Sequence, residues 1–423
     1  MKRAKGFALL AALTLGLAPG VGAAGPDTAA QDVAMGGSFF TRFERRVGYG
    51  GGAGDYASYN SDFVRYRARI SLDTGPMDIG SPWKLNARFV PQAGGIWSTG
   101  GDSLDDASLG VHEAFVRLKK GASRFEIGRF ELVYGDHLVL GNVGWHHLGR
   151  SFDGVRGHIQ PDPKGIWTDV FLTSVNEGPM NDVVSNDAFA GDTMLTGVYT
   201  GLGSILGEKA ALDFYLLGVL RPKYTTAEEV SYQGAGEFTL GSRIKQKAGP
   251  MDWRAEAGVQ LGSRRVDTEA VDVFAFQIDA EAGLNLEIAQ GLRIGAEGFF
   301  ASGDDPDTAD KLENWNQLYP TAHKWMGFMD YIGGRSNISG GIGHIKLTFL
   351  DRMVWMTDVH AFVRPRSPAD GQPEYMGIEV DNGLAYLLGK GVKARLAYDI
   401  FVQSSDTGGD TLNFTEVEFS TKF

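Results

Sequence analysis

The sequence predicts an all-β protein: a transmembrane antiparallel β-barrel of about 18 strands that follows an N-terminal signal peptide. Three observations support this prediction. Apolar and polar residues alternate in many segments, Gly accounts for 59 of the 423 residues and aromatic residues for 11%, and the connections between segments are alternately short and long. A barrel strand in a membrane needs one apolar and one polar face, because lipid covers one side and the lumen the other.

Residues 1–24 have the pattern of a secretory signal peptide. Lys2, Arg3 and Lys5 form a basic start, residues 7–17 are apolar, and small residues around Ala23 provide a cleavage site. The alternative is a membrane-anchoring helix, but the apolar run is shorter than the roughly 20 residues that a helical span needs. We therefore expect residues 25–423 to form a single barrel domain in the bacterial outer membrane.

Period-two alternation identifies the strands. In the segment 62–73, residues facing one side alternate with Arg65, Arg67 and Arg69 on the other. The last segment alternates in the same way and ends on Phe423, which is typical of bacterial outer-membrane barrels. The expected strands are residues 35–46, 62–73, 83–92, 109–119, 123–133, 154–160, 166–175, 193–201, 209–220, 236–247, 251–262, 271–284, 292–302, 338–349, 353–364, 376–387, 391–402 and 412–423.

The connections between these strands support the same architecture. Outer-membrane barrels have short periplasmic turns and longer extracellular loops. Short connections are expected at 120–122, 161–165, 248–250, 351–352 and 389–390, and long ones at 47–61, 93–108, 134–153, 176–192, 303–337 and 403–411. A soluble all-β fold is the alternative, but it would not leave one face of nearly every strand charged.

Composition excludes several other classes of protein. The chain has no Cys, which excludes disulfides and Cys-ligated metal sites, and its net charge of −12 argues against nucleic-acid binding. The mean hydropathy of −0.15 argues against a helical membrane protein.

The polar strand faces, which we expect to line the lumen, are rich in arginine. Rings of Arg form anion pathways, and the guanidinium group binds carboxylates in a bidentate manner. The alternative interpretation is that these residues pair with acids on neighbouring strands and stiffen the wall. The expected lining residues include Arg65, Arg67, Arg69, Arg88, Arg156, Arg243, Arg254, Arg293, Arg364 and Arg395.

Two stretches of sequence resemble the alginate export family of outer-membrane barrels. The first runs from Ile127 to Asp136 as IGRFELVYGD and continues at residues 149–156 as GRSFDGVR. The second, residues 316–324, reads NQLYPTAHK and is followed by Asp330 and Asn337. Compatible strand spacing extends from about residue 38 to the C-terminus.

The resemblance implies a monomeric channel with an electropositive constriction that secretes an anionic polysaccharide such as alginate. On the first stretch it implies pore residues Arg129, Glu131, Asp136, Arg150, Asp153 and Arg156, and on the second it implies gate residues Tyr319, His323, Lys324 and Asp330. The alternatives are a general or anion-selective diffusion porin, and, for the first stretch, an ion-pair network that only fastens a loop to the wall.

The expected partners follow from this function. They are outer-membrane lipid, the passively transported polysaccharide and a periplasmic polysaccharide-secretion scaffold. No nucleic-acid partner is expected. The segments 134–153 and 303–337 are longer than ordinary turns, so we expect at least one of them to fold into the lumen and restrict it.

No enzyme, cofactor or metal site is expected. Residues 101–104 spell GDSL, but they lie in a Gly-rich loop and lack a downstream D-x-x-H. His146 and His147 have no evident third metal ligand, and the acidic stretch 304–310 lacks the spacing of an EF-hand.

Overall fold

The computed structural model describes residues 33–48, 60–98, 108–176, 191–203, 207, 209–226, 228–308, 310–367, 374–404 and 410–423. The predicted signal peptide lies outside the described residues. The strands are β1 (Val33–Val47), β2 (Asn60–Thr74), β3 (Met77–Asp78), β4 (Lys84–Ser98), β5 (Ser108–Lys120), β6 (Ser123–Phe130), β7 (Phe152–Ile159), β8 (Trp167–Asn176), β9 (Thr193–Gly201), β10 (Ala210–Arg221), β11 (Tyr224–Thr225), β12 (Ser231–Tyr232), β13 (Ala235–Ala248), β14 (Met251–Val266), β15 (Glu269–Leu286), β16 (Leu292–Ala301), β17 (Lys311–Leu312), β18 (Ile338–Phe349), β19 (Met353–Val363), β20 (Tyr375–Gly389), β21 (Val392–Gln403) and β22 (Thr411–Lys422).

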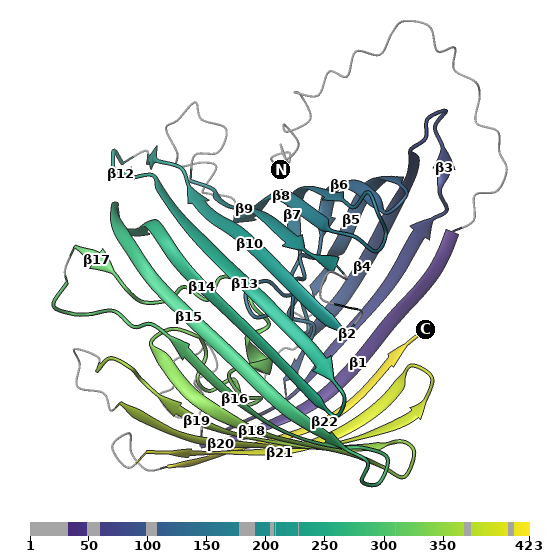
Figure 1. Cartoon of the computed structure of the whole chain (residues 1–423), viewed down its shortest axis with the longest axis vertical. Helices are drawn as coiled ribbons and strands as arrows, with labels where there is room; N and C mark the ends of the chain where they lie inside the picture. Colours follow the sequence, from purple (N-terminus) through teal and green to yellow (C-terminus); the bar gives the residue numbers. More distant parts are fainter. Residues whose placement is uncertain are drawn as a thin grey trace, which may run out of the picture.

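All strands except β11 and β12, which form a separate two-stranded sheet, belong to one closed sheet (Figure 1). Its pairings are antiparallel apart from that of the short β17 with β15. Each long strand pairs with the next along the chain, and β1 pairs with β22 from Ser38 opposite Lys422 to Val47 opposite Asn413. The sheet holds 20 strands, of which β3 and β17 have only two residues each, so 18 strands form the barrel. The predicted fold class and strand number are confirmed.

Most strand ends lie within a few residues of their expected positions, and two differences have a clear cause. β4 continues past Pro91 to Ser98, because a bulge between Val90 and Pro91 absorbs the proline and the chain then pairs with β2. β14 and β15 are longer than expected, and only Asp267 and Thr268 join them, so this outer connection is a tight turn.

The barrel carries its apolar surface on the outside. Phe89, Leu240 and Leu261 are 43%, 60% and 50% exposed, whereas Glu44 and Arg65 on the inner face are 0% and 1% exposed. An apolar outer surface over a charged interior is the reverse of the residue distribution in a soluble protein and is expected for a barrel surrounded by lipid. Among the described residues, no helix has the length and apolar character needed to cross a bilayer.

The two ends of the barrel can be assigned from the connections. Short turns at residues 121–122, 249–250, 350–352 and 390–391 lie at one end, which is the periplasmic end of such barrels. The C-terminus lies at this end too, since the backbone N–H of Gly37, near the start of β1, donates to the carbonyl oxygen of Phe423 at 2.8 Å.

Candidate functional site in the lumen

Two segments leave the wall at its outer end and pack against side chains inside the barrel. The first, residues 131–151, joins β6 to β7. The second, residues 302–337, joins β16 to β18 and contains β17 and a single 3-10 turn, η3 (Ala322–Lys324). We call them the first and second inward segments. Their hydrogen bonds to each other include Gly141 N–H to Tyr319 O at 2.8 Å and Tyr319 N–H to Val139 O at 3.0 Å.

Apolar side chains anchor both inward segments to the inner wall. Leu132, Val139 and Leu140 of the first segment pack with inward-facing aromatics such as Phe171 and Tyr215. The second segment contributes a further cluster with the wall of β15 to β22, formed in part by Trp315, Trp325, Met326 and Met329. Barrels of this size leave an aqueous channel unless chain fills it, so these clusters occupy space that solute would otherwise cross.

The arginines of β2 point inward and hold the first inward segment. Arg67 donates to the carbonyl oxygen of His146 at 2.8 Å, Arg69 donates to that of Leu148 at 3.1 Å, and Arg65 lies 3.0 Å from Nδ1 of His147. Guanidinium groups therefore satisfy backbone carbonyls that a chain folded away from water must otherwise leave unpaired.

Asp136 is the main electrostatic anchor of the first inward segment. Its carboxylate accepts hydrogen bonds from Arg243 at 2.7 and 2.9 Å and from Lys245 at 3.2 Å, and Lys324 of the second segment donates to its carbonyl oxygen at 3.3 Å. Burial by itself would raise the pKa of Asp136, but the attraction of Arg243, Lys245 and Lys324 lowers it to about 2. Asp136 is thus a carboxylate at every physiological pH.

Glu131 and Arg150 fasten the two ends of the first inward segment. Glu131 accepts from Asn142 at 2.9 Å and lies 2.6 Å from Nε2 of His112 on β5. Arg150 donates to the carbonyl oxygen of Pro320 at 2.8 Å and so ties the two inward segments together. Glu131, Asp136 and Arg150 of the predicted set therefore each help to hold the first inward segment inside the lumen, through different partners.

Arg129 and Asp153 do not belong to this group, and the prediction that they line the pore is wrong. They are cross-strand partners on β6 and β7, joined at 2.8 Å, with side chains 44% and 52% exposed. They share a face with Phe125 and Ile127, which are 40% and 45% exposed on the outer surface. β6 ends at Phe130 rather than at 133, so Glu131 leaves the strand while Arg129 keeps its outward direction.

A continuous stack of rings and guanidinium groups joins both inward segments to the wall. The guanidinium of Arg42 on β1 lies 3.9 Å from the ring of Trp145, which stacks on His323 at 3.8 Å. His323 stacks on Phe328 at 4.7 Å, and Arg395 on β21 closes the stack at 4.8 Å. Cation–π and stacking contacts of this kind restrict the relative motion of their members.

The second inward segment is held by carboxylates of β15 and β20. Backbone N–H groups of Phe328 and Met329 donate to Asp381 at 3.1 Å and to Glu379 at 2.9 Å. Arg335 pairs with Asp279 at 2.5 Å. Negative wall groups therefore hold the second segment, whereas positive groups hold the first.

The other predicted gate residues lie within these contacts. Tyr319 packs edge-on against Phe152 at 5.6 Å. His323 Nδ1 lies 3.1 Å from a carboxylate oxygen of Asp330, within the same segment. Lys324 lies over the ring of Trp325 at 4.2 Å in addition to its bond to Asp136.

The remaining predicted arginines are on the inner wall, with one exception. Arg364 follows β19 directly and donates its backbone N–H to Glu374 at the outer rim. The wall arginines pair with acids of the same or neighbouring strands: Arg88 with Asp73 and Glu113, Arg156 with Glu126, Arg254 with Asp279, Glu281 and Glu297, Arg293 with Asp252 and Glu281, and Arg395 with Glu416.

Three inward residues of β1 were missed from the sequence. Arg42, Glu44 and Arg46 are 1%, 0% and 2% exposed, and Glu44 bonds to both arginines of its own strand and to Arg65 at 2.8 Å. The signal was available, because these residues alternate with Thr41 and Phe43 as regularly as the arginines of β2 alternate with their neighbours.

His146 and His147 lie at the centre of the charged contacts of the first inward segment. Burial, then the nearby His147, Arg65 and Arg42, lower the pKa of His146 to about 3. Burial and Arg65 lower the pKa of His147 to about 4. The charged groups that face the pair are Arg42 and Glu44 of β1, Arg65 and Arg67 of β2, and Asp330 of the second inward segment.

Acid is therefore expected to release the first inward segment. A His exposed on release titrates near 6.5, so the released state binds more protons and the inward state loses stability as the pH falls from about 6.5 toward 4. Each His lowers the stability of the inward state by at most about 1.4 kcal/mol per pH unit, and solvent screening reduces this value. Single-channel recording should show open probability rising at acidic pH, and H146Q/H147Q should flatten that rise. A rise of the same size in the double variant would contradict this explanation.

Comparison with known proteins places this lumen in context. The family model described as Alginate export matches residues 86–371. No curated protein sequence matches the chain.

The similar solved structures are outer-membrane proteins of Pseudomonas aeruginosa. OccK2 (OpdF), solved in complex with glucuronate, is 13% identical with a TM-score of 0.62, and the alignment covers 94% of this chain and 99% of that one. OpdK, solved with vanillate, is 13% identical with a TM-score of 0.61 and coverage of 92% and 98%. OccK5 (OpdH) is 12% identical with a TM-score of 0.61 and the same coverage. At this identity the likeness concerns the fold.

Proposed function

Because the chain belongs to the Alginate export family and forms a barrel of the bacterial outer membrane, we propose that it exports an anionic polysaccharide by passive passage along the arginines of its lumen. Family and fold are those of a channel. In this proposal a single barrel works beside a periplasmic polysaccharide-secretion scaffold, and the inward segments restrict the lumen until polymer arrives.

The observation that carries the proposal is Arg67. It donates to a backbone carbonyl and lies 4.7 Å from the ring of Phe40, but among the described residues no carboxylate lies within 4.0 Å of its guanidinium. A cavity of about 290 Å³ toward the periplasmic end of β1 is lined in part by Arg67, by Lys422 and by Lys393, which pairs with Glu418 at 3.1 Å. A basic cavity at the end where an exported chain enters, with a guanidinium free of acid partners, suits a carboxylate-bearing sugar.

The surrounding wall supports the same sign of cargo. On β1 to β7, inward arginines outnumber the inward carboxylates with which they pair. The arginines are Arg42, Arg46, Arg65, Arg67, Arg69, Arg88, Arg117, Arg124 and Arg156, and the carboxylates, including those of β22 and the first inward segment, are Glu44, Asp73, Glu113, Glu126, Glu131, Glu416 and Glu418.

Diffusion of small carboxylates is the second candidate function. Two of the three similar barrels named above were solved with a small acid, glucuronate or vanillate, each of which carries one carboxylate. If this is the function, single small carboxylic acids pass through the lumen and a polysaccharide chain does not.

Oligouronates of increasing length distinguish the two candidates and test Arg67. Added on the periplasmic side of a planar bilayer at low pH, where the lumen opens, oligomers should block the current for times that grow with chain length. R67Q should weaken this binding about ten- to a hundredfold, since a charged hydrogen bond contributes about 1.5–3 kcal/mol. R45Q is the matched control, because Arg45 is 57% exposed on the outer face and pairs with Asp62.

Two outcomes would count against polysaccharide export. If monomeric uronate passes and oligomers never enter, diffusion of small acids is the better function. If neutral oligosaccharides block the current as well as oligouronates do, or R67Q matches R45Q, anion recognition at Arg67 is wrong.

A further inference from the structure

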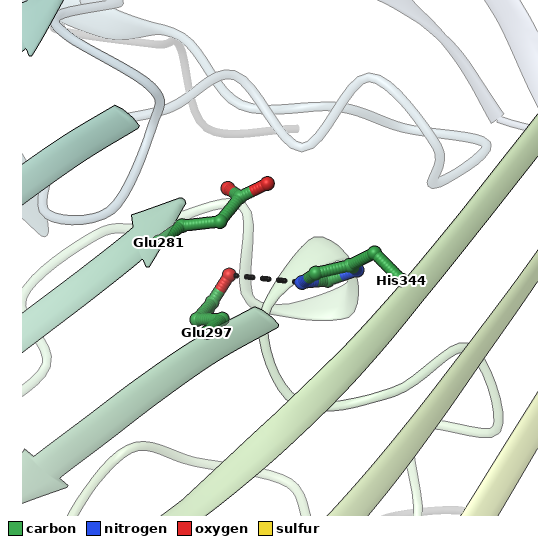
Figure 2. A group of neighbouring side chains, drawn as sticks. All are labelled: Glu281, Glu297 and His344. Carbon is green, nitrogen blue, oxygen red and sulfur yellow. Dashed lines mark ion pairs between the residues drawn. The ribbon is translucent and has the colours of Figure 1, made fainter. Parts of the chain in front are cut away.

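Three potential metal ligands converge on the inner wall, away from the inward arginines of β1 and β2. Figure 2 shows Glu281 of β15, Glu297 of β16 and His344 of β18 pointing toward one another, and one ligand atom of each lies within 4.8 Å of the others. From their geometry we infer that they form a binding site for a divalent first-row transition-metal ion, such as Zn²⁺ or Mn²⁺.

Strand register creates this arrangement. Glu281 and Glu297 are direct cross-strand partners, so both side chains project from the same point of the inner face. His344 pairs with Gly295, two residues from Glu297 on β16. Gly295 has no side chain, so the imidazole can reach across it toward the two carboxylates.

One ligand atom of the group has no partner in the part of the chain that the structure describes, and a second has only a long ion-pair contact (Figure 2). Glu297 is 7% exposed and accepts from Arg254 through Oε2 at 2.7 Å, while its Oε1 has no hydrogen-bond partner among the described residues. Nε2 of His344 likewise has no hydrogen bond within the described part of the chain and lies 3.4 Å from Oε2 of Glu297. A buried carboxylate oxygen left without a donor is costly unless a cation or proton occupies the space beside it.

A second carboxylate orients the imidazole for metal binding. Asp358 of β19 lies 2.7 Å from Nδ1 of His344, so it favours the tautomer with the proton on Nδ1. The lone pair of Nε2 then points at Glu297. Metal-bound histidines characteristically have this outer carboxylate, which fixes the ring and raises its basicity.

The charge of the network matches a divalent cation. The connected ion pairs around the site contain five carboxylates and three guanidinium groups, an excess of two negative charges when His344 is neutral. The carboxylates are Asp252, Asp279, Glu281, Glu297 and Asp358, and the guanidinium groups are Arg254, Arg293 and Arg335. An ion bound through Oε1 of Glu297 leaves the contact of Arg254 with Oε2 in place.

The ligand set and the access route define the class of ion. Side chains of Glu281 and His344 are 17% and 19% exposed, so an ion can arrive from the lumen. One imidazole nitrogen with two carboxylates suits Zn²⁺, Mn²⁺ or Co²⁺, whereas Ca²⁺ and Mg²⁺ prefer oxygen ligands alone. Water completes the coordination.

Metal titration of the full barrel in detergent tests the inference. After removal of metal with a chelator, Co²⁺ should bind with one ion per chain and develop visible d–d absorption, and Zn²⁺ should displace it. E297Q and H344Q should each weaken binding at least tenfold, and D358N, which changes only the orienting group, should weaken it by about tenfold.

The matched control is H158Q, because His158 on β7 also pairs with a carboxylate, Asp169, but belongs to no group of three potential ligands within the described residues. H158Q should bind Co²⁺ as the wild type does. Heat-modifiable mobility on a gel confirms that each variant is folded, and D358N and E297Q decide the question if H344Q does not fold. Absence of stoichiometric Co²⁺ uptake by the wild type, equal uptake by E297Q and wild type, or displacement by Ca²⁺ as readily as by Zn²⁺ would each overturn the proposed site.

Discussion

Deleting residues 306–334 and joining the ends with a short Gly-Ser linker should raise single-channel conductance several-fold. The deletion removes Trp315, Trp325, Met326 and Met329, which pack against the inner wall of β15 to β22. The pairing of the 18 barrel strands stays intact, and only the short β17 and its contact with β15 are lost. Water can hydrate Glu379 and Asp381, which accept backbone N–H groups of the deleted chain in the intact protein. Conductance in planar bilayers and permeation of large sugars into liposomes provide the measurement.

The control for this deletion is a shortening of the outer connection between β10 and β13. That connection carries the small β11–β12 hairpin, whose Tyr224 and Tyr232 stack on each other at 4.5 Å. The guanidinium of Arg265 lies over the ring of Tyr224 at 5.3 Å. Its removal should leave conductance unchanged. If the deletion of 306–334 gives a folded barrel with wild-type conductance, the second inward segment is only an outer cap, and the restriction lies in residues 131–151.

D136A should raise the equilibrium ratio of the released to the inward position of the first inward segment by about a hundredfold. The substitution removes the carboxylate that Arg243 and Lys245 share, and Arg243 keeps only its ion pair with Asp213. Removing one partner of a buried ion pair costs about 3–5 kcal/mol, and about 1.4 kcal/mol corresponds to a factor of ten. Open probability at neutral pH should therefore rise strongly, with little further rise on acidification.

The matched control is D153N on the outer surface. Asp153 also pairs with an arginine, Arg129, but both side chains are about half exposed, and exposed pairs contribute about 0–1 kcal/mol. D153N should gate as the wild type does. If D136A and D153N have the same open probability, the ion pairs of Asp136 do not hold the lumen closed.

The wall of the barrel could be predicted from sequence because its cause is local. Lipid lies on one side of each strand and the lumen on the other, so the alternation of residues 62–73 or 251–262 specifies both strand and face. The arginines of β2 were placed on the inner face for this reason. Arg129 shows the limit of motif matching, since its neighbours Phe125 and Ile127 already marked its face as outward.

The contents of the lumen depend on tertiary structure. Loop length indicated that residues 134–153 and 303–337 are special, but only the closed sheet brings Trp145, His323 and Phe328 into one stack between Arg42 and Arg395. The same holds for Glu281, Glu297 and His344, which are far apart in sequence and meet through the register of three strands. Alternation is a relation between neighbouring residues, so the sequence alone determined the barrel, its strands and their faces. Contacts inside the lumen join residues of different strands and segments, such as Arg42 with Trp145 and Trp145 with His323, so only the tertiary structure decided what fills it.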